Sequence, residues 1–173
     1  MIQRHFVLAG ILFANHALAQ NSTVEWSDLR AVRPQSCLEF LAPLEDNTDC
    51  DRQTLVAKLA ERRIAACTPG NPALNGRQVK IAGYAHPLEV EFTSVRDFLL
   101  TPPLRSDCRH PSPPLPDQVI RVHFPKGIDI SFDPVWVTGD LTLQRTEDDN
   151  APSSYRLDAK SVVPATLIDA NGK

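Results

Sequence analysis

The chain has 173 residues, which is enough for one domain with its own core and marginal for two. Its composition, with 42% hydrophobic and 23% charged residues and fifteen prolines against seven glycines, excludes a disordered chain and favours a globular fold rich in strands and loops. A net charge of −3 without a basic cluster argues against nucleic-acid binding, which depends on neutralising phosphates.

The N-terminus has the order of features that is typical of a secretion signal. Arg4 supplies a positive charge, residues 6–13 are apolar, and Ala17-Leu18-Ala19 matches a cleavage site. We therefore expect residues 1–19 to be a signal peptide and the protein to be secreted across the inner membrane into the periplasm; a buried N-terminal helix is the alternative. The mature chain has no other apolar run long enough to span a membrane.

The four cysteines all follow this segment. An even number of cysteines in an exported chain predicts disulfides. Two bridges allow three pairings, and the sequence does not choose among them. The candidates are Cys37, Cys50, Cys67 and Cys108.

Residues 20–73 are predicted to form an N-terminal extension with one helix. Residues 26–29 suit a single turn that docks two apolar side chains, and a further turn can precede Pro43. The helix is expected over 52–67, capped by Asp51 and ended by Thr68-Pro69-Gly70. Its apolar stripe at helical spacing consists of Val56, Leu59, Ala60, Ile64 and Cys67.

From Leu74 onward the apolar residues alternate with a period of two. This pattern predicts five strands, over 79–92 with a bend at Pro87, 95–100, 119–124, 134–143 with a bend at Gly139, and 155–163. We expect a mainly β fold, in which residues 74–164 form a small OB-like five-stranded barrel and residues 165–173 a frayed tail. A β-sandwich is the alternative.

A proline-rich segment connects the second and third predicted strands. Because proline fixes φ, this segment is expected to hold one path and to serve as a binding loop. Its candidate residues are Pro102, Cys108, His110, Pro113, Pro114 and Gln118.

Cys108 and His110 are the sharpest chemical candidates in this loop. In an extended segment, side chains two residues apart point to the same side, so a thiolate and an imidazole could reach one zinc or copper ion. Two ligands do not complete a site, so His86 or His123 would have to join. The alternative, which we weight more heavily, is that Cys108 forms a disulfide with Cys67 or another cysteine.

Catalytic signals are weak. The sequence contains no G-x-S-x-G, P-loop, G-x-G-x-x-G, H-E-x-x-H or C-x-x-C motif, so we lean against an enzyme. No cofactor is firmly indicated, and zinc is the one candidate. Four aromatic residues could line a ligand groove, although packing in the core is the favoured interpretation. They are Trp26, Tyr84, Trp136 and Tyr155.

Several blocks of residues together resemble a known family. They are Trp26–Leu29, Asn75–Glu89, Phe98–Pro102, Cys108–His110, Pro113-Pro114, Asp117-Gln118, Pro134–Leu141 and Tyr155–Ala159. The chain resembles, over about residues 24–163, an uncharacterised family of exported bacterial proteins, family 3299 among the domains of unknown function. The resemblance implies a periplasmic location and, in some bacteria, gene neighbourhoods linked to zinc response and transport. It implies no activity, and Ser106-Asp107 stand here where the family has Gly-Ala.

Three functional hypotheses follow from the sequence. The first is a non-enzymatic periplasmic binding or adaptor module that presents residues 102–118 to a protein partner in the cell envelope, such as a transport component. The second is a zinc- or copper-handling protein that uses Cys108, His110 and His86. The third and least favoured is a small hydrolase.

Overall fold

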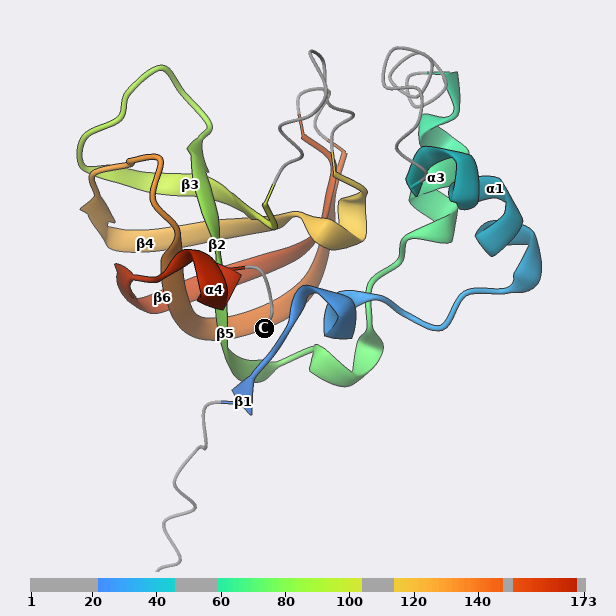
Figure 1. Ribbon diagram of the computed structural model, residues 1–173, viewed down its shortest axis with the longest axis horizontal. Coiled ribbons are helices and arrows are strands. Elements are labelled where there is room, and N and C mark those ends of the chain that lie inside the picture. Colours follow the sequence, from blue (N-terminus) through green and yellow to red (C-terminus); the bar gives the residue numbers. More distant parts are fainter. Residues whose placement is uncertain (1–21, 46–58, 104–113, 148–150, 171–173) are drawn as a thin grey trace, which may run out of the picture.

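The protein is described here from a computed structural model, which covers residues 22–45, 59–103, 114–147 and 151–170 (Figure 1). Strands dominate the described chain. Its elements are β1 (Ser22–Thr23), η1 (Trp26–Leu29), α1 (Gln35–Glu45), α3 (Glu61–Cys67), η2 (Pro72–Leu74), β2 (Arg77–Pro87), β3 (Val95–Thr101), η3 (Pro116–Gln118), β4 (Ile120–Ile128), β5 (Val135–Thr146), β6 (Ser153–Pro164) and α4 (Leu167–Ala170).

Five strands form a closed ring of hydrogen-bonded pairs. The order is β2-β3-β4-β6-β5, and β5 pairs with β2 again to close the ring. All of these pairs are antiparallel except β4 with β6, while β1 adds a short parallel pairing to β2. The ring closes because β2 is long: residues 77–83 pair with β5, and residues 84–87 pair with β3. The prediction of a mainly β fold is confirmed.

The main core lies inside this ring and follows the predicted alternation. In β4, for example, Ile120, Val122 and Phe124 are buried, and the residues between them are partly exposed. Leu29 of η1 joins the same cluster, which consists mainly of Val79, Ile81, Phe98, Leu100, Ile120, Val122, Val137, Leu141, Tyr155 and Leu157. The irregularity expected at Gly139 is present as a register shift in β5, where an added Cβ would lie 2.4 Å from the carbonyl oxygen of Asp158.

One strand prediction and the prediction for the C-terminal tail need correction. β2 ends at Pro87, and residues 88–94 form an exposed loop instead of extending the strand. Proline lacks the N–H that a ladder requires, so the pairing with β3 stops there although the apolar alternation continues. The tail does not fray over residues 167–170, because α4 contacts β2 and Ala170 is buried.

The N-terminal extension contains two described helices where one was predicted. α1 extends past Pro43, where the sequence predicts only a turn before this proline. α3 occupies the end of the predicted 52–67 helix, and Ile64 and Cys67 are buried as expected. Leu59 is 82% exposed, so its assignment to the buried stripe was wrong, while Val56 lies outside the described residues. Among the described helices, none has the length and apolar character needed to cross a membrane.

α1 and α3 form a small lobe beside the ring (Figure 1). A disulfide joins Cys37 to Cys67, and these helices bury Leu41 and Ile64 in a second, smaller apolar cluster. The last turn of α3 is tied to the ring by Arg145, whose guanidinium donates a hydrogen bond of 2.6 Å to the carbonyl oxygen of Ala65. A cation is favourable at this end of a helix, because the free carbonyl groups carry partial negative charge.

Candidate functional site

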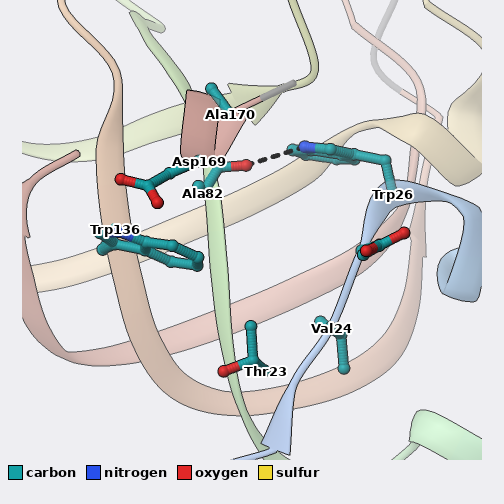
Figure 2. Close-up of a pocket in the computed structure, with 8 residues that line it drawn as sticks. Thr23, Val24, Trp26, Ala82, Trp136, Asp169 and Ala170 are labelled. Atoms are coloured by element: carbon teal, nitrogen blue, oxygen red, sulfur yellow. Dashed lines mark hydrogen bonds between the residues drawn. The ribbon is translucent and has the colours of Figure 1, made fainter. Parts of the chain in front are cut away.

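A pocket of about 160 Å³ lies against the outer side of β2, between the N-terminal segment and α4 (Figure 2). Two indole rings contribute to its walls, and Ala82 lies between them in the view of Figure 2. Its lining residues are Thr23, Val24, Glu25, Trp26, Ala82, Trp136, Asp169 and Ala170. The pocket therefore joins residues from four separate segments of the chain.

Trp26 is fixed in the pocket wall by three contacts. Its indole Nε1 donates a hydrogen bond of 2.8 Å to the carbonyl oxygen of Ala82. Its own carbonyl oxygen accepts a hydrogen bond of 2.9 Å from the side chain of Gln118. The third contact depends on Gly83, where an added Cβ would lie 2.8 Å from Cζ2 of Trp26 and 2.6 Å from the carbonyl oxygen of Thr101. The ring can lie against β2 only because residue 83 has no side chain.

Trp136 forms the facing wall and comes from β5. It pairs with Ala82 in the register of β2 and β5, and Lys80 pairs with Thr138 in the same ladder. The ammonium nitrogen of Lys80 lies 4.4 Å from the centroid of the Trp136 ring, which is a cation–π contact. This indole therefore already holds a cation within the protein.

Asp169 supplies a carboxylate to the pocket from α4. Its Oδ2 accepts hydrogen bonds of 2.8 Å from both the backbone N–H and the hydroxyl of Thr166, the residue before the helix. These hydrogen bonds lower the pKa of Asp169, and a hydrogen bond from Trp136 and the charge of Lys80 lower it further. The carboxylate is thus held ionised, and its position is fixed by the start of α4.

This arrangement suits one chemical group. Because Lys80 already lies over the ring of Trp136, an incoming cation would depend on the indole of Trp26 and on the ionised carboxylate, which accepts hydrogen bonds from an ammonium or guanidinium group. Pockets for whole small molecules usually measure roughly 300–1,000 Å³. At about 160 Å³, this one fits a single side chain or headgroup better than a nucleotide or a complete cofactor.

The predicted metal residues are only partly described. His86 is half-buried, and its Nε2 lies 3.0 Å from the hydroxyl oxygen of Thr101. That hydroxyl donates its proton to the carbonyl oxygen of Pro102. The tautomer consistent with both contacts donates from Nε2 of His86 and carries no proton on Nδ1. Burial lowers the pKa of His86, so the neutral imidazole is favoured.

The other candidate ligands do not gather around His86 in the described part of the chain. His123 contacts Asp97 instead, with 2.8 Å between Nδ1 and Oδ1. Cys108 and His110 lie outside the described residues, as does Pro113 of the predicted binding loop. Within residues 22–45, 59–103, 114–147 and 151–170, no group of three or more His, Cys, Asp or Glu side chains could hold a metal ion.

The ends of the predicted binding loop are described and ordered against the ring. Pro102 follows β3, while Gln118 is buried and bonds to Trp26. Beside it, the buried carboxylate of Asp117 pairs with Arg33 of the N-terminal extension. The C-terminal end of this loop is thus anchored at the pocket wall.

The Cys37–Cys67 disulfide settles the pairing of two of the four cysteines. Cys67 pairs with Cys37, so a bridge from Cys67 to Cys108 is wrong. Cys50 and Cys108 lie outside the described residues, and the role of Cys108 as a bridge or a ligand stays a prediction.

The proposed chemistry of the pocket depends on three side chains. The sequence indicated two of them and missed one. Trp26 and Trp136 were named as groove candidates, and the pocket brings them together. Tyr155 packs inside the core as the favoured interpretation expected. Asp169 was missed because the tail was predicted to fray. Thr166-x-x-Asp169 is a helix-capping pattern that could have revealed it.

Comparisons with known proteins agree on one family. The family model described as "Protein of unknown function (DUF3299)" matches residues 26–164. Among solved structures, the chain is similar to a DUF3299 family protein from Pseudomonas aeruginosa PAO1, with 25% sequence identity and a TM-score of 0.56. That match covers 86% of this chain and 98% of the Pseudomonas chain. No curated protein matches.

Proposed function

Given that the chain belongs to the DUF3299 family, we propose that it is an exported, non-enzymatic binding or adaptor module of the cell envelope, possessing a recognition pocket for a lysine or arginine side chain of a protein partner. The observation that carries this proposal is the convergence of two indoles and an ionised carboxylate on one small pocket, formed by Trp26, Trp136 and Asp169.

The energetics set the expected affinity. A cation over an indole contributes about 0.5–1 kcal/mol when exposed and about 2 kcal/mol when desolvated. The carboxylate of Asp169 is accessible to water, so its hydrogen bond to an incoming cation adds little to this contact. One side chain alone therefore binds with a Kd on the order of 1 mM or weaker. A partner would reach micromolar affinity only through further contacts around the pocket.

The described C-terminal end of the binding loop lies beside the pocket wall and offers a place for such contacts. Gln118, at the end of residues 102–118, donates its hydrogen bond to Trp26 of the pocket wall. The loop is rich in proline, and proline-rich segments lose little conformational entropy when they dock. A partner that inserts a basic side chain into the pocket would meet the anchored end of this loop. This proximity supports an adaptor, which needs a shaped surface and no reaction chemistry.

Tryptophan fluorescence tests the proposal directly, because Trp26 and Trp136 are the two tryptophans of the chain. The full protein is titrated with N-acetyl-lysine amide and N-acetyl-arginine amide up to high millimolar concentration, with N-acetyl-glutamine amide as the neutral control. We expect a saturable change with the cationic amides alone, and its loss in Asp169→Asn. The matched control Asp140→Asn, at an exposed carboxylate on β5, should respond like the wild type. An equal response to the glutamine amide would contradict the proposal.

A zinc- or copper-handling role is the second candidate, and the state of His86 favours it. An imidazole that donates one N–H to a neighbouring group and keeps its other nitrogen unprotonated is prepared to bind a metal. Cys108 and His110 would supply the further ligands. Titration of zinc against a chromogenic chelator should show tighter binding by wild type than by His86→Ala or His110→Ala. Equal binding by these variants and by the control His123→Ala would contradict this role.

A further inference from the structure

Two loops at one end of the ring expose large apolar side chains. Residues 88–94 connect β2 to β3, and residues 129–134 connect β4 to β5. Val90 is 92% exposed, Phe92 56% and Phe132 98%. Isolated exposed apolar residues are common, but a group on neighbouring loops marks an interaction surface.

The two loops are bonded to each other. The backbone N–H of Ile130 donates to the carbonyl oxygen of Phe92 at 2.8 Å, and the backbone N–H of Ser94 donates to Oδ1 of Asp129 at 2.9 Å. Val90 lies two residues before Phe92, and Phe132 lies two residues after Ile130. The three exposed apolar side chains therefore lie on two loops that are bonded to each other, and we call this group the loop-tip patch.

The base of the loop-tip patch is built around an unusual backbone. Ser94 has a φ of +54°, in the left-handed region that non-glycine residues rarely adopt. Gly127 packs directly against it, and a Cβ at Gly127 would lie 2.8 Å from the carbonyl oxygen of Ser94. Such close packing fixes the base of the two loops, so less conformational entropy is lost there when a partner binds.

The charges around the patch identify the partner. Four exposed carboxylates alternate with or flank the apolar side chains, whereas the basic residues of these loops and the adjoining strand ends are fewer. The carboxylates are those of Glu89, Glu91, Asp129 and Asp133, and the basic residues are Arg96 and Lys126. Insertion into a bilayer would force Glu89 and Glu91 toward the hydrocarbon and anionic headgroups, which is costly. A second copy of the chain would place the same carboxylates opposite each other across a two-fold axis.

From this chemistry we propose that the loop-tip patch docks a protein segment that carries apolar side chains bordered by lysine or arginine. The proposal is independent of the tryptophan pocket, which shares no lining residue with the patch. Three apolar side chains make a small interface, so the complex is weak and sensitive to salt.

A designed peptide pair provides the test. Fluorescein-labelled peptides of leucine alternating with lysine, and of leucine alternating with glutamate, are titrated with the full protein and followed by anisotropy. We expect binding of the leucine–lysine peptide alone, weakened about tenfold in Val90→Ser/Phe132→Ser and in 0.5 M salt. Val32→Ser, at a fully exposed valine on the N-terminal extension, is the matched control and should bind like wild type.

A charge-reversal variant tests whether the carboxylates of the loop-tip patch select a basic partner. Glu89→Lys/Glu91→Lys should lose the leucine–lysine peptide and gain the leucine–glutamate peptide, with an unchanged melting temperature showing that the fold is intact. The proposal is overturned if neither peptide distinguishes Val90→Ser/Phe132→Ser from Val32→Ser. It is also overturned if the patch variants lose binding to phosphatidylglycerol vesicles, or lose self-association in sedimentation, while peptide binding is unaffected.

Discussion

The indole of Trp26 donates a hydrogen bond of 2.8 Å to the carbonyl oxygen of Ala82, which lies 56 residues away in the sequence. This bond brings the N-terminal segment onto β2 and turns the outer face of that strand into a pocket. Because β2 also closes the ring of strands through its pairings with β3 and β5, the pocket wall is attached to the strand that holds the fold together.

Gly83→Ala is expected to damage both the fold and the pocket. The new Cβ would meet the backbone oxygen of Thr101 at 2.6 Å and the ring of Trp26 at 2.8 Å. Overpacking of this kind costs about 1–3 kcal/mol. Urea unfolding should show that loss, and the tryptophan emission should shift toward red as Trp26 leaves β2. The control Gly76→Asn should lose less, because no atom lies within 4 Å of a Cβ there and asparagine tolerates its positive φ.

Tyr155 predicts a pH dependence at alkaline pH. Its buried hydroxyl donates to the carbonyl oxygen of Leu29 and accepts from the backbone N–H of Asn71. Burial raises the pKa of Tyr155 to about 12 from 10.0. The unfolded chain therefore releases this proton first, so the stabilising contribution is complete below pH 10 and is lost as pH rises from 10 to 12.

Tyr155→Phe isolates that contribution. The variant should be destabilised by about 0.5–1.5 kcal/mol at neutral pH, because the two hydrogen bonds of the hydroxyl are lost. The backbone N–H of Asn71 keeps its bond of 3.0 Å to the carbonyl oxygen of Leu29. Urea unfolding at a series of pH values should show the gap between wild type and variant narrowing above pH 10. A gap that stays constant up to pH 12 would contradict this role of the hydroxyl.

The buried ion pair of Arg33 and Asp117 should behave non-additively. Arg33→Met leaves a buried carboxylate without its partner, which costs about 3–5 kcal/mol. Burial raises the pKa of Asp117 and Arg33 opposes that rise, so the loss in Arg33→Met should be smallest at acidic pH and grow as pH increases. Urea unfolding of Arg33→Met/Asp117→Asn should show a smaller loss than Arg33→Met alone. A double variant that is less stable than the single one would contradict the account.

The disulfide is expected to stabilise the lobe of α1 and α3 more than the ring. It closes a segment with a sequence separation of 30 residues, for which chain entropy predicts roughly 3–4 kcal/mol. Limited trypsin digestion of Cys37→Ser/Cys67→Ser should cut first near Arg62 and Arg63 of α3. Amide exchange in β5 and β6 should change much less, since most of the ring core is separate from the lobe cluster. Equal loss of protection in both regions would contradict this division.

The strand ring was predictable because each strand buries one face. Strict alternation in residues such as Ile120, Val122 and Phe124 fixes which side chains enter the core. The limits of the strands were less predictable, since Leu88, Val90 and Phe92 continue the same alternation in a loop. There the missing N–H of Pro87 matters more than the pattern.

The pocket could be predicted only in part. Aromatic residues at 26 and 136 are visible in the sequence, but their approach depends on the register in which β2 pairs with β5 and on the missing side chain at Gly83. Asp169 belongs to a single turn of helix that is stabilised by its contacts with β2. Local propensity is a poor guide to so short a helix, because tertiary packing decides whether it forms.

The most direct test of the pocket is the indole region of the ¹H–¹⁵N spectrum, in which the two tryptophans give two Nε1–H signals. Addition of N-acetyl-lysine amide should shift both signals along one saturable curve, and Asp169→Asn should weaken that curve severalfold. Signals that stay fixed at high millimolar amide, or that move equally with N-acetyl-glutamine amide, would contradict a pocket for a cationic side chain.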